Sequence, residues 1–139
     1  MYDSILLPTD GSDSANAAYE HAVAMAEAFD ATLHVLYVVN TSYQDIGATG
    51  KSLNSVRETG RSVLSETRTR AEDAGLTVET HLEEGEPYQE IVDRGEGVDV
   101  IVMATRGRSG IDRYLLGSVT EKVVRTSETP VFTVRGGDG

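Results

Sequence analysis

Short apolar runs, typical of buried strands, alternate along the chain with longer segments whose apolar positions recur at helical spacing. The runs predict strands at residues 2–7, 32–39, 76–83, 98–103 and 130–135. The helical spacing predicts helices at about residues 15–29, 53–74, 87–95 and 118–126. This strict alternation of strand and helix favours a parallel sheet, because each helix can cross over the sheet between two strands.

The apolar content of each predicted strand indicates how deeply it lies in the sheet. Residues 98–103, VDVIVM, form an almost continuous apolar run, as expected of a strand covered on both faces. Residues 76–83 alternate apolar and polar side chains, which predicts a half-exposed strand at a sheet edge. Residues 40–51 are polar and are predicted to form a surface loop. The predicted fold is a single three-layer α/β domain with a five-stranded parallel sheet and helices on both faces.

Local signals place the ends of several elements. Pro8 ends the first strand, because proline cannot donate a hydrogen bond to a sheet ladder. The residues after it, TDGSDS, are turn and helix-capping types. Gly75 is placed to end the long second helix, and Pro87 opens the third helix at a first-turn position. The first strand therefore ends directly at a polar turn.

Length and composition limit the classes of protein to which the chain can belong. With 139 residues it is expected to form one domain, residues 1–139, around a single core. No apolar run approaches the roughly 20 residues of a membrane span, and no signal-peptide pattern begins the chain, so a soluble cytoplasmic protein is expected. Cysteine is absent, which excludes disulfides and thiolate metal sites.

The residue types that most often carry catalysis are sparse. The histidines His21, His34 and His81 are scattered along the chain, so no metal cluster is expected. His21 falls in a predicted helix and His34 in a predicted strand, where packed or surface roles are favoured over catalysis. No nucleophile is paired with a base, so a binding protein is favoured over an enzyme.

The chain is strongly acidic, with a formal net charge of −11 at pH 7. This charge argues against a general nucleic-acid-binding protein, because lysine and arginine bind phosphate backbones. Only two of the twelve basic residues are lysines, Lys51 and Lys122. Such a composition is similar to that of proteins from high-salt cytoplasms, where salt screens the repulsion between surface carboxylates. We interpret the chain as halophilic.

The segment from residue 106 to residue 125 departs from this acidic composition. It holds five basic residues and two acidic ones, and three glycines punctuate it: Arg106, Gly107, Arg108, Gly110, Asp112, Arg113, Gly117, Glu121, Lys122 and Arg125. Residues 118–121, SVTE, match the capping-box pattern of a helix start. Flexible backbone, positive charge and helix-start amides suit an anion such as a phosphate chain. The alternative is a chance cluster of solvated arginines.

The topology predicts where such an anion would bind. In parallel sheets, ligands bind beyond the carboxyl ends of the strands, at the point where the strand order reverses. Residues 8–10 and 103–105 are the strand ends expected to flank that point. The TDGSDS turn and the glycine-rich segment would then face each other across one crevice.

Three stretches together resemble the universal stress protein family. They are PTDGS at residues 8–12, GIDRYLLGSVTEKVVR at residues 110–125 and the closing strand PVFTV. Nucleotide-binding members of that family have a glycine, two residues, a second glycine, nine residues, and a third glycine followed by Ser or Thr. Gly107, Gly117 and Ser118 match this motif, whereas Ala104 occupies the first glycine position.

The resemblance implies a function, a topology and a set of site residues. It implies an ATP-type nucleotide-binding regulatory protein of the stress response, binding ATP with or without Mg²⁺, or AMP or ADP. It also implies the strand order 3-2-1-4-5, a homodimer formed through the fifth strands, and a protein partner that the sequence does not identify. The implied nucleotide-binding residues are Pro8, Thr9, Asp10, Val38, Met103, Ala104, Gly107, Arg108, Gly117, Ser118 and Val119.

The resemblance also implies which part of the nucleotide each of these residues would contact. Asp10 would accept hydrogen bonds from the ribose or base, the backbone of Val38 would meet the adenine edge, and Met103 would pack near the base. Gly107 and Arg108 would wrap the phosphates. The start of the helix at Gly117 would supply amides and a hydroxyl.

Several alternatives stay open at the level of sequence. The Ala104 methyl group could weaken binding, and the chain could be a dimeric interaction module that no longer binds nucleotide. Asp10 could simply cap the following helix, although Ser12 or Asp13 could take that role. Glu121 would oppose a phosphate unless its side chain points away. Gly110 lies off the motif and is interpreted as a turn residue.

Other nucleotide-related classes match the chain poorly. The TDGSDS turn has only a faint likeness to the phosphate loop of adenylating ATP pyrophosphatases. A phosphoacceptor receiver domain would need clustered acidic residues and a late lysine, whereas Lys122 falls within a predicted helix. A P-loop NTPase is excluded because its GxxxxGK[ST] motif is missing.

Overall fold

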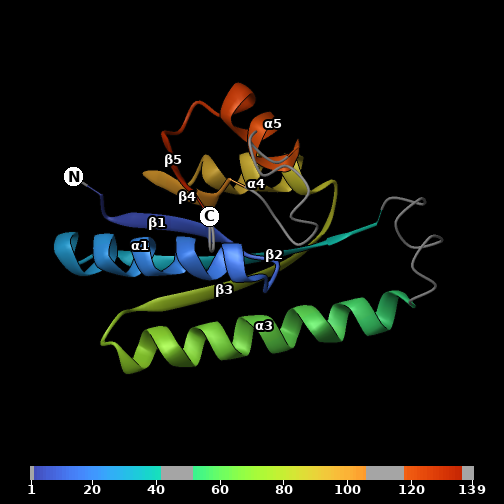
Figure 1. The fold of residues 1–139 in the computed structure, drawn as a ribbon, viewed down its shortest axis with the longest axis horizontal. Helices are drawn as coiled ribbons and strands as arrows, with labels where there is room; N and C mark the ends of the chain where they lie inside the picture. Colours follow the sequence, from blue (N-terminus) through green and yellow to red (C-terminus); the bar gives the residue numbers. More distant parts are fainter. Residues whose placement is uncertain (1, 42–51, 106–117, 136–139) are drawn as a thin grey trace.

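A computed structural model describes residues 2–41, 52–105 and 118–135 of the chain (Figure 1). Five strands form one parallel sheet in the order β3-β2-β1-β4-β5. The strands are β1 (Ser4–Pro8), β2 (Thr32–Asn40), β3 (Val78–Gly85), β4 (Val100–Ala104) and β5 (Val131–Val134). The helices are α1 (Asp13–Phe29), α3 (Leu53–Asp73), α4 (Pro87–Gly95) and α5 (Ser118–Thr126). The expected α/β fold and strand order 3-2-1-4-5 are confirmed.

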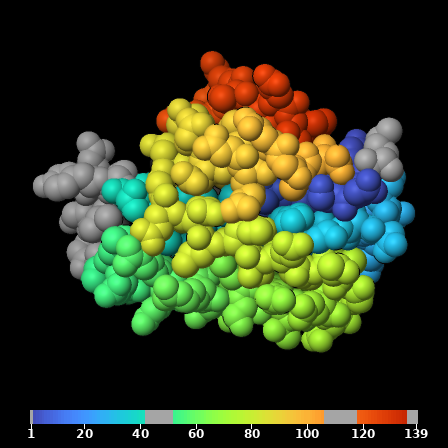
Figure 2. Space-filling model, turned by 180° about the vertical axis from the view of Figure 1, so that it is seen from behind, coloured from blue at the N-terminus to red at the C-terminus, as the bar shows by residue number. Residues whose placement is uncertain are grey.

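The sheet separates two hydrophobic clusters, because successive side chains of a strand point to opposite faces. Ile5 and Leu7 of β1 belong to the cluster that alanines of α1 and Leu64 and Ala71 of α3 complete. Leu6, between them, belongs to the cluster built with α4 and α5. Figures 1 and 2 show α3 at the bottom of the molecule and α4 with α5 at the top. The three-layer arrangement therefore follows from the near-continuous apolar strands.

The predicted edge strands are confirmed, but four strands start later than predicted. β1 begins at Ser4 rather than at residue 2, and β5 begins at Val131 rather than at residue 130. β3 begins at Val78 rather than at residue 76. Gly75 adopts a positive φ of 91°, and Leu76 N–H donates to the carbonyl of Ala71 over 3.1 Å, so Leu76 still belongs to the end of the helix. β4 begins at Val100, two residues later than predicted. The loop prediction for residues 40–51 falls almost entirely outside the described residues.

None of the helices in the described ranges combines the length and the apolar character needed to cross a lipid bilayer. The longest, α3, has a mostly polar outer surface, and only three of its residues are buried: Gly60, Leu64 and Ala71. This agrees with the prediction of a long helix over residues 53–74, and the three buried residues form its narrow apolar side. Its role is to cover β2 and β3 on one face of the sheet.

The exposed carboxylate of Asp99 ties the start of β1 to the turn before β4. Its Oδ2 accepts hydrogen bonds from Asp3 N (2.8 Å) and Ser4 N (3.1 Å). The Asp99 backbone N–H in turn donates to the carbonyl of Ser4 over 3.0 Å. The bond from Asp3 N, followed by that from Ser4 N, lowers the pKa of Asp99 below its usual value. The charged form is therefore favoured in the folded state.

We expect Asp99→Asn to lower the melting temperature at neutral pH. Because the folded-state pKa of Asp99 is lowered, its stabilisation is fully present above the unfolded pKa of about 3.9 and is lost as pH falls through the folded pKa. The difference in melting temperature between parent and variant should therefore shrink on acidification below about pH 4. Thermal unfolding between neutral and acidic pH measures it. The exposed control Asp93→Asn should show no such loss at neutral pH, and equal effects of the two variants would contradict the interpretation.

Candidate functional site

The candidate site lies where the strand order reverses. β1 pairs with β2 on one side and with β4 on the other, so the chain leaves β1 toward one edge and β4 toward the other. Pro8 and Ala104 are the last residues of these neighbouring strands. The two strand ends expected from the sequence therefore lie side by side, at the position where parallel sheets bind ligands.

The turn after β1 is held by its own side chains. Gly11 N donates to Thr9 Oγ1 over 3.1 Å, and Ser12 N donates to Asp10 Oδ1 over 2.9 Å. Gly11 has a φ of 81°, a conformation that favours glycine. Ser12 is the N-cap of α1, where its Oγ accepts from Ala15 N over 3.2 Å. Ser12, not Asp10, thus takes the capping role, and Asp10 orders the turn that precedes it.

The end of β2 extends past the end of β1. Pro8 is in register with Leu36, whose carbonyl accepts a hydrogen bond from Thr9 N over 2.9 Å. Backbone groups of alternate strand residues face the same side. The N–H and C=O of Val38 therefore face the space beyond the end of β1, next to the polar turn. This is the orientation that a backbone contact with a ligand would need.

The end of β4 has an ordinary extended backbone. Met103 is buried, and Ala104 is half-buried and pairs with Val134 of β5. Among the described residues, Asp30 is the one non-glycine residue with positive φ, so Ala104 does not adopt a conformation that requires glycine. The backbone thus accommodates alanine at the first glycine position of the family motif.

Thr120 joins the end of β4 to α5, and the sequence reasoning missed it. Its side chain is 4% exposed, and Oγ1 donates to the carbonyl of Ala104 over 2.7 Å. This bond fixes the amino-terminal turn of α5 beside the carboxyl end of β4. A threonine within a predicted capping sequence gives no sign of such a contact, because its partner lies 16 residues away.

Glu121, in the first turn of α5, forms an ion pair within the helix. The helix begins at Ser118 itself, which is exposed, while Val119 is half-buried against the α4–α5 cluster. Glu121 Oε2 lies 3.3 Å from Arg125 Nη2, one turn further along, so the carboxylate is engaged toward the carboxyl end of the helix. The positive charge of Arg125 partly offsets the negative charge of this carboxylate, which lessens the expected conflict with a bound anion.

Three of the predicted phosphate-binding residues, Gly107, Arg108 and Gly117, lie outside the described residues. The same holds for Arg106, Gly110 and Arg113 of the basic, glycine-rich segment. The described structure therefore brings together the nucleoside half of the predicted site and the helix start, namely Pro8, Thr9, Asp10, Val38, Met103, Ala104, Ser118 and Val119.

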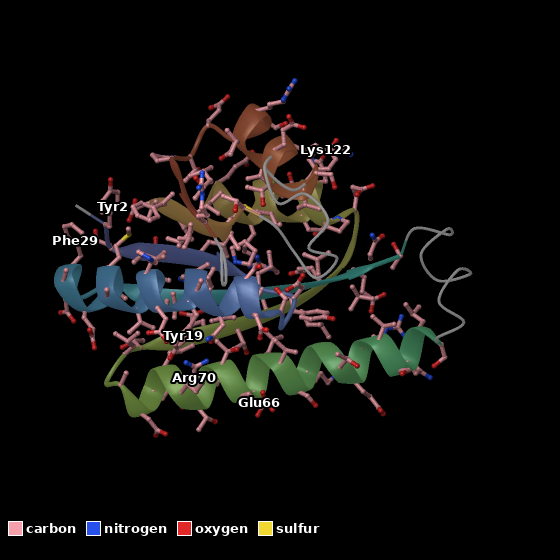
Figure 3. All side chains as sticks on the ribbon, in the orientation of Figure 1. Tyr2, Tyr19, Phe29, Glu66, Arg70 and Lys122 are labelled. Atoms are coloured by element: carbon pink, nitrogen blue, oxygen red, sulfur yellow. The ribbon has the colours of Figure 1, made fainter. Side chains whose placement is uncertain are left out.

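A small cavity of about 120 Å³ lies beside the polar turn, between α1 and α3. Thr9, Gly11 and Ser12 line it together with Tyr19 and Arg70. The Arg70 guanidinium stacks over the Tyr19 ring, 4.2 Å from its centroid, and Figure 3 shows the two side chains meeting between the helices. Burial raises the pKa of Tyr19, and the Arg70 charge partly offsets this rise.

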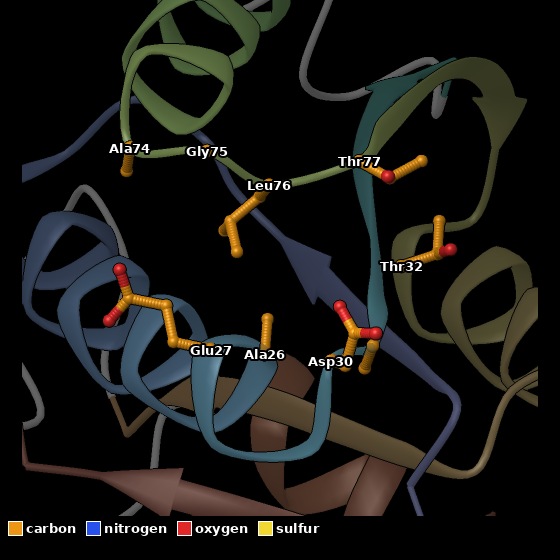
Figure 4. A pocket seen from close by; sticks show the side chains of 9 residues that line it. Ala26, Glu27, Asp30, Thr32, Ala74, Gly75, Leu76 and Thr77 are labelled. Carbon is orange, nitrogen blue, oxygen red and sulfur yellow. The ribbon is translucent and has the colours of Figure 1, made fainter.

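A larger cavity of about 220 Å³ lies at the opposite end of the strands. It is formed between the end of α1 and the turn that leads from α3 into β3, and Figure 4 shows Glu27 and Asp30 across from Leu76 and Thr77. Thr32 is the first residue of β2, and Thr77 directly precedes β3. This cavity therefore adjoins the amino ends of the strands rather than their carboxyl ends. It is therefore separate from the candidate site.

The chain matches known proteins over nearly its whole length. The model of the universal stress protein family matches residues 1–135. Universal stress protein MJ0531 of Methanocaldococcus jannaschii is 39% identical over 141 residues, which cover 97% of this chain and 83% of that protein. These matches extend from β1 to β5 and include both halves of the candidate site.

Solved structures show the same arrangement. The hypothetical protein MJ0577 of Methanocaldococcus jannaschii superposes with a TM-score of 0.84 and 31% identity, covering 100% of this chain and 99% of that one. A universal stress protein in complex with cAMP superposes with a TM-score of 0.77 and 28% identity, covering 98% and 99%. With the family model matching almost every residue, this chain belongs to the universal stress protein family.

Proposed function

We propose that this chain binds an adenine nucleotide, foremost ATP, and acts as a regulatory stress-response protein with little or no hydrolysis. The observation that carries the proposal is the adjacency of two groups at the switch point of the sheet. The Asp10 turn follows β1, and the amino-terminal turn of α5 is tied by Thr120 to the neighbouring β4. A hydrogen-bond acceptor and helix-start amides are the groups that a nucleoside and its phosphates need.

The described residues fit the nucleoside end of such a ligand. Asp10 would accept hydrogen bonds from the ribose or base, and the backbone of Val38 would meet the adenine edge. Met103 would pack near the base. The cAMP complex of a similar protein supports an adenine nucleotide as the ligand class.

At the phosphate end, Ser118 and Val119 would present the first backbone N–H groups of α5. The motif adds Gly107, Arg108 and Gly117 as partners of the phosphates, and Mg²⁺ could accompany ATP there. These phosphate contacts belong to the proposal.

Homodimerisation through β5 also belongs to the proposal. β5 lies at an edge of the sheet, and its Phe132 side chain is 42% exposed. An edge strand with an exposed aromatic side chain suits pairing with a second copy of the same strand. The assembly would leave the opposite edge, β3, free for other contacts.

Titration calorimetry with ATP at high salt tests the nucleotide proposal. The parent protein should bind one ATP per chain, and Asp10→Asn should weaken binding about 10- to 100-fold, because a hydrogen bond to a charged group is worth about 1.5–3 kcal/mol. Asparagine keeps an oxygen that can accept from Ser12 N, so the turn should persist. The control Asp13→Asn changes an exposed carboxylate in the first turn of α1 and should leave ATP affinity unchanged. The absence of saturable heat in the parent would reject the proposal.

The second candidate function is an interaction module that has lost nucleotide binding through Ala104. It requires Ala104→Gly to create binding or to strengthen it markedly. The extended backbone of Ala104 favours the first proposal, which requires the parent to bind and the glycine variant to gain little. The same calorimetric titration separates the two.

A further inference from the structure

Two histidines far apart in the chain meet on one face of the sheet. His34 lies on β2, and His81 lies on the edge strand β3, 47 residues later. The parallel register pairs His34 with Glu79 and Leu36 with His81, so these side chains share the face on which Leu36 packs. The histidines that are scattered in the sequence are thus brought together with a carboxylate.

The ring nitrogens are close enough to bind a common ion. His34 Nδ1 lies 3.1 Å from His81 Nε2, and one ligand atom from each of His34, Glu79 and His81 lies within 4.8 Å of the others. Two nitrogens that bind one tetrahedral zinc ion at about 2.0–2.1 Å lie roughly 3.3 Å apart. The spacing of the two imidazoles is therefore already near that of a metal site.

The surroundings leave these three side chains accessible from solvent. Both histidines are half-buried, and Glu79 is exposed. The neighbouring carboxylate of Glu83 is engaged by Arg94 of α4. Burial, followed by the charges of Arg94 and His34, lowers the pKa of His81. Glu79 therefore offers the third ligand atom, a carboxylate oxygen.

We propose that His34, Glu79 and His81 bind a divalent transition-metal ion of the Zn²⁺ class. Two imidazole nitrogens and one carboxylate oxygen suit this class, whereas Ca²⁺ and Mg²⁺ prefer oxygen ligands throughout. Three protein ligands leave a fourth position for water or for a group from a partner. The site is new relative to the nucleotide proposal, because His34 lies four residues before Val38, about 13 Å along the strand.

Zinc titration of the untagged protein tests the site. The titration is done without nucleotide, which would chelate zinc, and in excess Mg²⁺, which occupies all-oxygen carboxylate sites. The parent should bind one Zn²⁺ per chain. Glu79→Gln should weaken this binding at least about tenfold, since loss of even an outer-shell partner costs about 10- to 100-fold. Because Glu79 is exposed, the circular dichroism spectrum of the variant should match that of the parent.

The third histidine of the chain provides a matched control. His21 is exposed on α1 and contacts the Phe132 ring, at a centroid distance of 5.8 Å. His34→Ala and His81→Ala should each weaken zinc binding at least about tenfold, as for any lost ligand, and His21→Ala should leave it unchanged. In long-range ¹H–¹⁵N spectra of the parent, zinc should shift the ring nitrogens of His34 and His81 and leave those of His21 in place.

The NMR arm does not depend on the stability of any variant. Ring shifts confined to His34 and His81, saturating at one equivalent, would establish the site. Equal, gradual shifts of all three rings, or a zinc affinity that Glu79→Gln and His34→Ala leave unchanged, would overturn the proposal. Either of these two outcomes would mean that the 3.1 Å contact between His34 and His81 is only a hydrogen bond between two imidazoles.

Discussion

Replacing Ile101 with alanine is expected to lower the free energy of unfolding by about 2–5 kcal/mol. Ile101 is fully buried in β4, where it is in register with Leu6 of β1 and with Val131 of β5. It packs in the cluster that α4 and α5 form with the sheet. A Cβ atom on Gly95 would lie only 2.6 Å from Ile101 Cδ1, so the end of α4 rests directly on this side chain. Truncation would leave a cavity that rigid neighbours on both sides cannot fill.

Urea unfolding followed by circular dichroism measures this loss. The salt concentration is held fixed, because the net charge of −11 makes the stability sensitive to screening. The control Val124→Ala removes an apolar side chain of α5 that is 43% exposed, and it should change the unfolding free energy by no more than about 0.5 kcal/mol. An Ile101→Ala loss as small as that of the control would contradict the buried position of β4.

The central position of β4 could be predicted from sequence because a strand buried on both faces consists almost entirely of apolar residues. Residues 100–103 are all buried and all apolar, and their valines and isoleucine favour strands. The alternation at residues 76–83 likewise revealed an edge strand. Periodicity does not carry the lateral order of strands, however, and the order 3-2-1-4-5 was predicted through the family resemblance.

Short sequence motifs predicted the structure less well where a nearby residue offers a competing ion pair or hydrogen bond. The SVTE sequence predicts that Glu121 turns back toward the start of α5, but Arg125 lies on the same helix face and engages it. At Leu76 the alternating pattern continues into the strand, yet the turn at Gly75 keeps this residue bonded to α3. In both cases a short pattern fits two structures, and the tertiary context selects one.

The candidate site was predicted in part, and the missing part consists of contacts between distant segments. Asp10, Val38 and Ala104 were predicted as nucleotide-binding residues through the resemblance, and the strand ends that carry them lie at the point where the strand order reverses. The bond from Thr120 to Ala104, the stacking of Arg70 on Tyr19 and the pairing of His34 with His81 were not predicted. Each depends on strand register or helix packing, which no local pattern in a single sequence specifies.

Replacing Thr120 with valine is expected to lower the free energy of unfolding by about 1–3 kcal/mol and to weaken ATP binding. Valine keeps the shape of the side chain but cannot donate to the carbonyl of Ala104, so a buried hydrogen bond of 2.7 Å is lost. This bond holds the start of α5 against the end of β4. Its loss should therefore displace the helix-start amides that the nucleotide proposal assigns to the phosphates.

Thr129→Val separates the effect on stability from the effect on the site. Thr129 Oγ1 donates to the carbonyl of Gly95 over 2.8 Å, a bond of the same type that joins the segment after α5 to the end of α4. Urea unfolding should show a loss for both variants, whereas calorimetry with ATP should show weaker binding for Thr120→Val alone. Equal ATP affinities in the two variants, alongside similar stability losses, would mean that Thr120 only stabilises the fold. A selective loss in Thr120→Val would identify it as the residue that positions α5 for the phosphates.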